Sequence, residues 1–146
     1  MPTIPTLLLY LWISAVSLPQ QGTLTLDITN IDTAKGSLRI AVFNSETTFL
    51  NDEQAIAGTI VAVRSTKPVQ VKLSDIPFGK LAIAIHHDVN DNGKIDKNSF
   101  GIPMEPYAFS NNPSVKWRSP TFAEALFEFK ETNTTLQVNL KRWRKH

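Results

Sequence analysis

Residues Leu81–Asp96 read LAIAIHHDVNDNGKID, and this stretch decides the fold that the sequence predicts. Leu or Ile occupies every second position from Leu81 to Ile85, and Ala82 and Ala84 lie between them. Because successive side chains of a strand point to opposite faces, both faces of this strand are apolar. We expect such a strand in the middle of a sheet, covered on both faces or packed tightly on one. The oxygen-rich segment DVNDNGKID follows it directly and predicts a long loop.

Shorter apolar alternations on both sides of this stretch predict six further strands. They cover residues 24–28, 38–42, 59–63, 69–73, 126–130 and 134–140. The turn-forming segment Asn30–Gly36 separates the first two, so we expect these two to pair as a hairpin. Short helical turns are expected within 45–57 and 119–125, the second with Ser119 as its cap. About seven short strands with close turns favour an all-β, Ig-like β-sandwich with Greek-key connections and a long loop after the fifth strand.

Composition limits the classes of protein and of site. The chain has 146 residues, of which 42% are hydrophobic, as expected for one globular domain. It has no cysteine, which excludes a disulfide framework, a thiol nucleophile and a cysteine zinc site. The last six residues, KRWRKH, contain four of the 15 Lys and Arg residues. The rest of the chain therefore has 11 basic and 13 acidic residues. The basic balance therefore belongs to a tail at 141–146, and we expect no nucleic-acid partner.

The N-terminal residues predict export. Leu7–Val16 is an apolar stretch with the length of a signal-peptide core, too short to span a bilayer. Ala15 and Ser17 are small residues placed for cleavage after Ser17. The sequence thus predicts a signal peptide at 1–17, a β-sandwich domain at 18–140 and a periplasmic or extracellular location. The alternatives are an uncleaved anchor or a buried first strand.

The loop after the fifth strand has the spacing of a calcium loop. Asp88, Asn90 and Asn92 occupy positions 1, 3 and 5, and Asp96 occupies position 9. Alternate side chains of a tight turn point toward one centre, where a hard cation takes six to eight oxygens. Gly93, at position 6, permits the sharp turn, and the carbonyl of Lys94 would be the next ligand.

Position 12 of this loop is Ser99 instead of Glu, so the bidentate carboxylate is missing and Glu105 would have to come from the following turn. We therefore predict a weak Ca²⁺ site. The alternative is an ordinary turn, since Asn and Asp accept turn dihedrals readily.

Two histidines precede the loop, and adjacent strand residues point to opposite faces. His87 continues the apolar face and is expected to be a core histidine. A hydrolase acting on envelope polymers through His87, Asp88 and Glu105 is the alternative to a non-enzymatic protein. No nucleophile motif accompanies these residues, so the non-enzymatic interpretation is preferred.

Four segments together resemble a known bacterial family. They are GSLRIAVFNSETTFL (36–50), IPFGKLAIAIHHDVNDNGKID (76–96), FGIPMEPYAFSNN (100–112) and SPTFAEALF (119–127). They occur in the order found in the exported bacterial proteins grouped as domain of unknown function 2141. The resemblance implies a secreted or periplasmic β-sandwich without established activity, and the IPFGKLAIAIHHD phrase also resembles prealbumin-like sandwiches. The chain departs from the family's phrase at Pro106, where Gly is expected.

The second half of the shared motif supplies aromatic residues with two possible roles. Tyr107, Phe109 and Trp117 are aromatic residues that either cap the sandwich or line a groove for a sugar ring or peptide. Asn111 would add an amide to that groove. The expected partner is an envelope component, either a protein or a glycan. The basic tail suggests weak contact with an anionic membrane, and the alternative is a frayed C-terminus.

Overall fold

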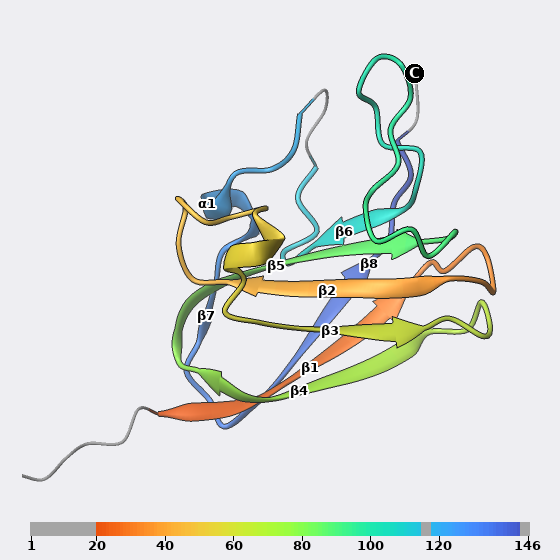
Figure 1. Cartoon of the computed structure of the whole chain (residues 1–146). Coiled ribbons are helices and arrows are strands. Elements are labelled where there is room, and N and C mark those ends of the chain that lie inside the picture. The colour runs from red at the N-terminus through yellow and green to blue at the C-terminus, as the bar shows by residue number, and fades with distance from the viewer. Residues whose placement is uncertain (1–19, 115–117, 144–146) are drawn as a thin grey trace, which may run out of the picture.

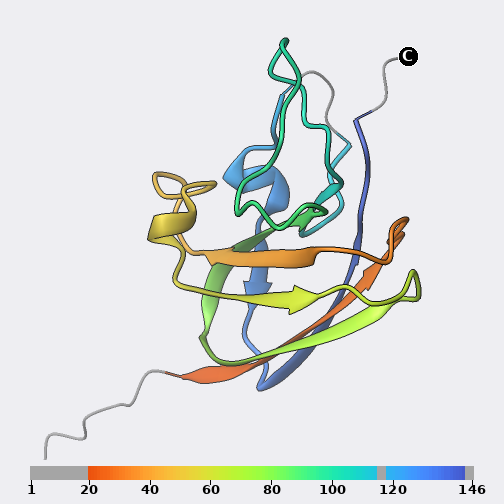
Figure 2. The same ribbon diagram turned by 45° about the vertical axis from the view of Figure 1, so that its right-hand side comes forward.

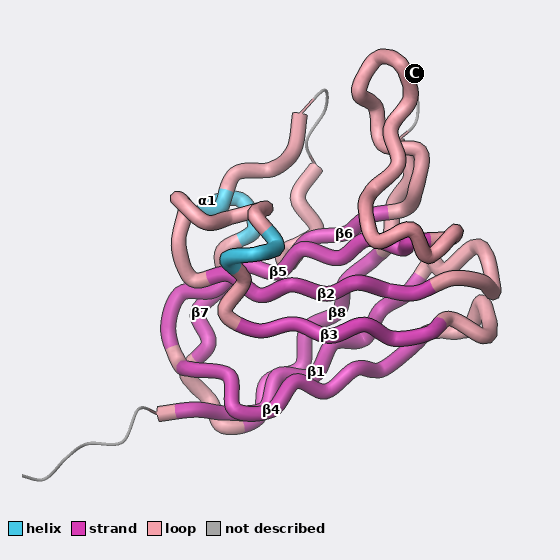
Figure 3. Tube along the Cα trace, viewed as in Figure 1, coloured by secondary structure: helices cyan, strands magenta, loops and turns pink. Residues whose placement is uncertain are grey.

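The structure is a computed structural model, and it describes residues 20–114 and 118–143. The predicted signal peptide and Trp117 lie outside the described residues. The described chain contains β1 (Gln21–Thr29), β2 (Ser37–Phe43), a 3-10 helix η1 (Asp52–Gln54), β3 (Ala57–Ala62), β4 (Val69–Pro77), β5 (Gly79–Asp88), β6 (Tyr107–Phe109), α1 (Phe122–Ala125), β7 (Phe127–Phe129) and β8 (Asn133–Asn139). Figure 1 shows these elements along the chain, and Figure 3 shows how small the helical share is.

The strands form two sheets that face each other. The smaller sheet has the order β4-β1-β8, and the larger has the order β3-β2-β5-β6, with β7 also pairing with β5. The β-sandwich prediction is therefore confirmed. All seven predicted strands are present, and the additional strand β6 pairs with β5 through His86, Ile85 and Ala84. Among the described residues, no helix is long and apolar enough to cross a membrane.

The predicted hairpin between residues 24–28 and 38–42 is wrong. β1 pairs with β4 in antiparallel and with β8 in parallel, whereas β2 pairs with β3 and β5. The segment 30–36 instead carries the chain from one sheet to the other. Gly36 ends this crossover with φ 74°, and a side chain there would collide with the backbone of Asp88 and Val89.

The core lies between the sheets and explains why the pairing could not be read from alternation. Leu24, Leu26 and Ile28 of β1 are completely buried, as are Leu38 and Val42 of β2. Both strands therefore show the same in-out pattern while belonging to opposite sheets. Each such side chain contributes about 1.5–3 kcal/mol when it leaves water.

β5 is the central strand that its composition predicts. It pairs with β2 along one edge and with β6 and β7 along the other. Its inward residues Leu81, Ile83 and Ile85 are buried in the core. Its outward residues share rows with the neighbouring strands, since Arg39, His86 and Tyr107 are in register, as are Ala41, Ala84 and Phe109.

Three non-strand segments stand around the outer face of the larger sheet. They are η1, α1 and the long loop between β5 and β6 (Figures 1 and 2). The predicted helical turn within 119–125 is present as α1, but its cap is Thr121 instead of Ser119. Thr121 accepts a hydrogen bond from the Glu124 N–H, and the Glu124 side chain accepts one from the Thr121 N–H. These segments surround the outer face of the larger sheet.

Candidate functional site

The carboxylate of Glu105 closes the long loop. This side chain is 6% exposed, and its two oxygens accept hydrogen bonds from the backbone N–H groups of Val89 at 2.8 Å and Asp96 at 3.1 Å. The Met104 N–H also donates to the Asp96 carbonyl at 2.8 Å. Glu105 therefore joins the beginning of the loop to its middle through backbone groups.

Asp88 holds the first turn of the loop. Its Oδ1 accepts from the Asn92 N–H at 3.1 Å, and its Oδ2 accepts from the Gly93 N–H at 2.8 Å and from Arg39 Nε at 2.7 Å. Burial by itself would raise the pKa of this carboxyl, but the Arg39 guanidinium and the two backbone donors outweigh it, so the pKa lies below its ordinary value. Asp88 is a buried, charged acceptor.

The remaining predicted cation ligands converge on Asp96. Asn90 Nδ2 donates to Asp96 Oδ2 at 2.6 Å, and Asn92 Nδ2 donates to Asp96 Oδ1 at 2.8 Å. The Asn90 side-chain oxygen accepts from the Asn92 N–H, and the Asn92 side-chain oxygen accepts from the Lys94 N–H, each at 3.1 Å. The side chains of Asn90 and Asn92 thus meet the Asp96 carboxylate, as their spacing predicts, whereas Asp88 is connected to them through the backbone N–H of Asn92.

The donor set of this cluster fits a hard cation in part. A half-turn of the two asparagine amides would bring their oxygens beside the Asp96 carboxylate, as Ca²⁺ requires, but it would also remove the acceptors of the Asn92 and Lys94 N–H groups. Against this, Arg39 already neutralises Asp88, and both Glu105 oxygens have backbone donors. Within residues 20–114 and 118–143, no three His, Cys, Asp or Glu residues gather as a metal centre.

His87 and His86 lie on opposite faces of β5. His87 is completely buried, its Nε2–H donates to the Lys35 carbonyl at 2.6 Å, and its Nδ1 has no hydrogen-bond partner. The expectation of a core histidine is confirmed. His86 lies on the outer face, where burial is the largest cause that lowers its pKa. The structure therefore places His87 in the core, while Asp88 and Glu105 are occupied by loop hydrogen bonds.

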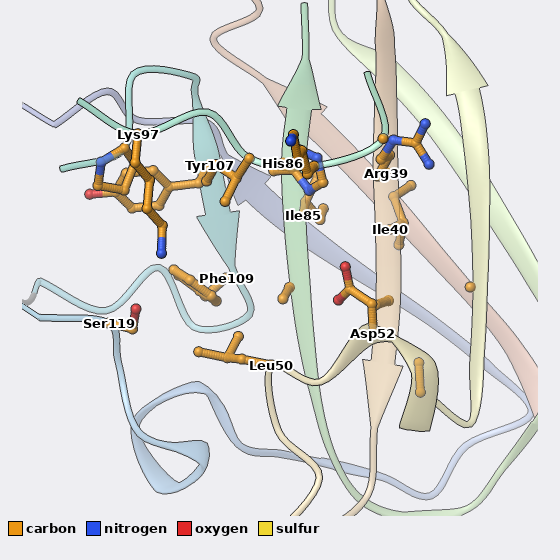
Figure 4. A pocket seen from close by; sticks show the side chains of 18 of the residues that line it. Arg39, Ile40, Leu50, Asp52, Ile85, His86, Lys97, Tyr107, Phe109 and Ser119 are labelled. Atoms are coloured by element: carbon orange, nitrogen blue, oxygen red, sulfur yellow. The ribbon is translucent and has the colours of Figure 1, made fainter. Parts of the chain in front are cut away.

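A cleft of about 1320 Å³ lies over the outer face of the larger sheet. Its floor includes the small residues Ala41 of β2, Gly58 of β3 and Ala84 of β5. Figure 4 shows Tyr107 and Phe109 of β6 beside β5, with Leu50 and Asp52 entering from the segment that contains η1. The cleft exists because the side chains of its floor are small, while larger side chains surround the floor.

Aromatic and aliphatic side chains form the walls. The rings of Tyr107 and Phe109 have centroids 5.9 Å apart, and Phe109 also packs against Phe49 at 6.3 Å. Burial raises the pKa of the Tyr107 hydroxyl. Three of the large hydrophobic residues that remain exposed lie in this lining, namely Leu50, Ile60 and Phe100. Exposed apolar groups gathered in a concave surface are typical of a binding site.

The charged side chains of the cleft are mostly cationic. Arg39, Lys94, Lys97 and Arg118 line it together with one acid, Asp52. Arg39 is paired with Asp88, and Arg118 makes two hydrogen bonds of 2.7 Å with Glu124. No hydrogen bond or ion pair is found in the described part of the chain for the side-chain amines of Lys94 and Lys97.

The structure places only some of the predicted binding residues in the cleft. Tyr107 and Phe109 line the cleft, whereas Asn111 does not, and its amide donates to the Leu126 carbonyl. Sequence reasoning missed the floor at Ala41, Gly58 and Ala84, because small outward residues on separate strands carry no local signal of a shared surface.

The first residues of the basic tail are bonded to the domain. Lys141 and Tyr107 exchange backbone hydrogen bonds of 2.8 and 2.9 Å, and the Arg142 guanidinium pairs with Asp32. Contacts of the domain therefore continue beyond residue 140, the predicted end of the sandwich.

Comparison with known proteins gives one family. Residues 26–137 match the family described as uncharacterized protein conserved in bacteria (DUF2141). Searches of the curated proteins and of the solved structures found no match. The matched range contains nearly all strands of the sandwich, the long loop and most of the residues that line the cleft. The chain is therefore a member of this uncharacterised bacterial family, domain of unknown function 2141.

Proposed function

We propose that this protein is an exported, non-enzymatic β-sandwich module that binds a component of the cell envelope in the cleft on the outer face of its larger sheet. The observation that carries this proposal is the cleft itself, in which Leu50, Ile60 and Phe100 remain exposed above a floor of small residues. A soluble domain gains nothing in stability from exposing such groups, and a bound partner would remove them from water.

The hydrolase alternative has less support. Catalysis by two acids needs side chains that reach a substrate, one of them as a proton donor. Asp88 and Glu105 instead satisfy backbone N–H groups of the loop, and His87 faces the core. These contacts have a simpler use in holding the loop as a wall of the cleft.

Calcium forms a second part of the proposal. Residues Asp88, Asn90, Asn92 and Asp96 would supply the oxygens, with the Lys94 carbonyl as a further ligand, and Glu105 would support the loop backbone. Binding at this site would be weak, with a dissociation constant on the order of 0.1–1 mM, because only two carboxylates are available in the cluster. Its effect would be to stiffen the segment that carries Lys94 and Lys97 into the cleft.

The proposed binding is tested by cysteine protection, since the natural chain has no cysteine. Ala84→Cys introduces a thiol on the cleft floor, and Thr25→Cys introduces one on the outward side of the central strand of the other sheet. The rate of maleimide labelling is measured with and without a bacterial envelope extract. We expect the extract to slow labelling at position 84 and not at position 25. Equal slowing at both positions, or none, would overturn the proposal.

A further inference from the structure

We propose that the cleft binds a single-chain fatty acid, with the acyl chain on the apolar floor and the carboxylate at Lys94 and Lys97. This inference rests on the proposed binding function and adds the chemical class of the ligand. It follows from the separation of apolar and charged groups within the cleft lining.

The apolar part of the lining suits an unbranched chain. Ala41 and Ala84 are adjacent on paired strands, and Gly58 lies opposite Ala41 on β3, so the floor runs across three strands. A larger side chain is excluded at Gly58, because an added Cβ would lie 2.5 Å from the Ile40 carbonyl oxygen. Ile60 and Phe109 stand beside this floor. A flexible methylene chain can follow such a surface and bury the exposed apolar groups.

The charged part selects the head group. The two arginines of the lining are already paired with Asp88 and Glu124, so their guanidinium groups are committed within the protein. Lys94 and Lys97 are the remaining cations among the described residues of the lining, and both belong to the wall formed by the long loop. Lysine ammonium groups act as point charges and bind a carboxylate without bidentate geometry. A carboxylate at the end of an unbranched chain is the simplest anionic head group that matches both the two lysines and the apolar floor.

Asp52 gives the ligand a direction, since no other acid lines the cleft among residues 20–114 and 118–143. Asp52 lies in η1, and Figure 4 shows it entering the cleft from the side opposite Lys97. A carboxylate would be repelled near Asp52 and attracted near the two lysines. The head group is thus expected at the wall of the long loop, and the chain end toward η1 and Leu50.

The test compares ligands that share one chain and differ in head group. Laurate, dodecyl maltoside and dodecyltrimethylammonium are titrated calorimetrically into the full chain, each below its critical micelle concentration. We expect laurate to bind at least about tenfold more tightly than the other two, because two partly exposed ion pairs together contribute about that factor. Equal affinity for laurate and the maltoside would overturn the assignment of the head group.

Variants locate the site. Lys94→Gln combined with Lys97→Gln should weaken laurate binding about tenfold and leave maltoside binding unchanged. The control pair Lys67→Gln and Lys72→Gln makes the same change of charge at positions outside the cleft lining and should have no effect. Ala84→Leu should weaken binding of every dodecyl ligand by filling the floor.

Circular dichroism first establishes that each variant is folded. If Ala84→Leu does not fold, the lysine variants still test the proposal. Loss of laurate binding in the control pair equal to that in the cleft pair would also overturn the proposal. No laurate binding by the natural chain, together with protection of Ala84→Cys by envelope extract, would refute the fatty acid and leave the cleft as a binding site for another ligand.

Discussion

Asp88 of β5 accepts a hydrogen bond of 2.7 Å from Arg39 of β2, although the two residues are 49 positions apart in the sequence. The Asp88 side chain is completely buried, and that of Arg39 is 28% exposed. The pair connects the long loop to the sheet, because the same carboxylate accepts two N–H groups of the loop and the same arginine lines the cleft. Loop and cleft are thus mechanically linked at this pair.

Breaking the pair should destabilise the domain. Asp88→Asn keeps the size of the side chain but removes the charge, so the Arg39 guanidinium loses its partner and one loop N–H loses an acceptor. We expect a loss of about 2 kcal/mol in the free energy of unfolding by urea, less than the roughly 3–5 kcal/mol of a fully buried pair because Arg39 is partly exposed. The exposed Glu128–Lys130 pair is the control, and Glu128→Gln should have little effect.

The same variant should change how the free energy of unfolding depends on pH under acidic conditions. The folded-state pKa of Asp88 lies below its ordinary value, so the unfolded chain takes up a proton first as the pH falls. The stabilisation is complete above about pH 5 and is lost progressively as the pH falls through the ordinary pKa toward the folded-state pKa. Urea midpoints between pH 6 and pH 3 should fall less steeply for Asp88→Asn than for the natural chain. Identical slopes would show that Asp88 has the same pKa in both states.

Glu105 provides a separate test of the loop. Glu105→Gln replaces one acceptor oxygen with an NH₂ group, so either the Val89 or the Asp96 N–H loses its partner. We expect a loss of about 1–3 kcal/mol in stability and faster proteolysis within 89–104, since the loop would open more often. Limited proteolysis followed by mass spectrometry measures the cleavage sites. Glu131→Gln, at an exposed turn, should leave the pattern unchanged.

Calcium should stabilise the natural chain if the oxygen cluster binds it. Thermal unfolding in 10 mM Ca²⁺, compared with EDTA, should show a higher Tm, because a ligand at a hundred times its dissociation constant adds about 2.7 kcal/mol and a weak site adds somewhat less. Asp96→Ala should abolish the shift, whereas Asp27→Asn on the other sheet should retain it. A shift of equal size in Asp96→Ala would place the ion elsewhere.

Export predicts a defined mature N-terminus. When the full-length chain is produced in a bacterium, intact-mass measurement of the periplasmic fraction should find a protein that begins at Leu18. Replacing Ala15 with a bulky residue, Ala15→Trp, should block cleavage and leave the longer chain in the membrane fraction. A full-length protein in the cytoplasm would contradict the prediction.

The sequence alone determined those features that depend on neighbours in the chain. Alternation from Leu81 to Ile85 identified a strand with two apolar faces, and such a strand is favourable only when it is central. The spacing of Asn90, Asn92 and Asp96 identified side chains that converge, because a tight turn brings alternate residues to one centre, and Asp88 is joined to them through the Asn92 N–H.

Tertiary structure decided which strands are neighbours. Apolar residues at every second position show which face of a strand is buried. They do not determine which strand it pairs with or which sheet it joins. The core residues of β1 and β2 have the same pattern, yet the two strands lie in different sheets. The cleft has the same origin, since Ala41, Gly58 and Ala84 become one surface only through the register of three strands. Arg39 likewise meets Asp88 only because β2 and β5 pair, and it is this non-local pairing that joins the loop to the cleft.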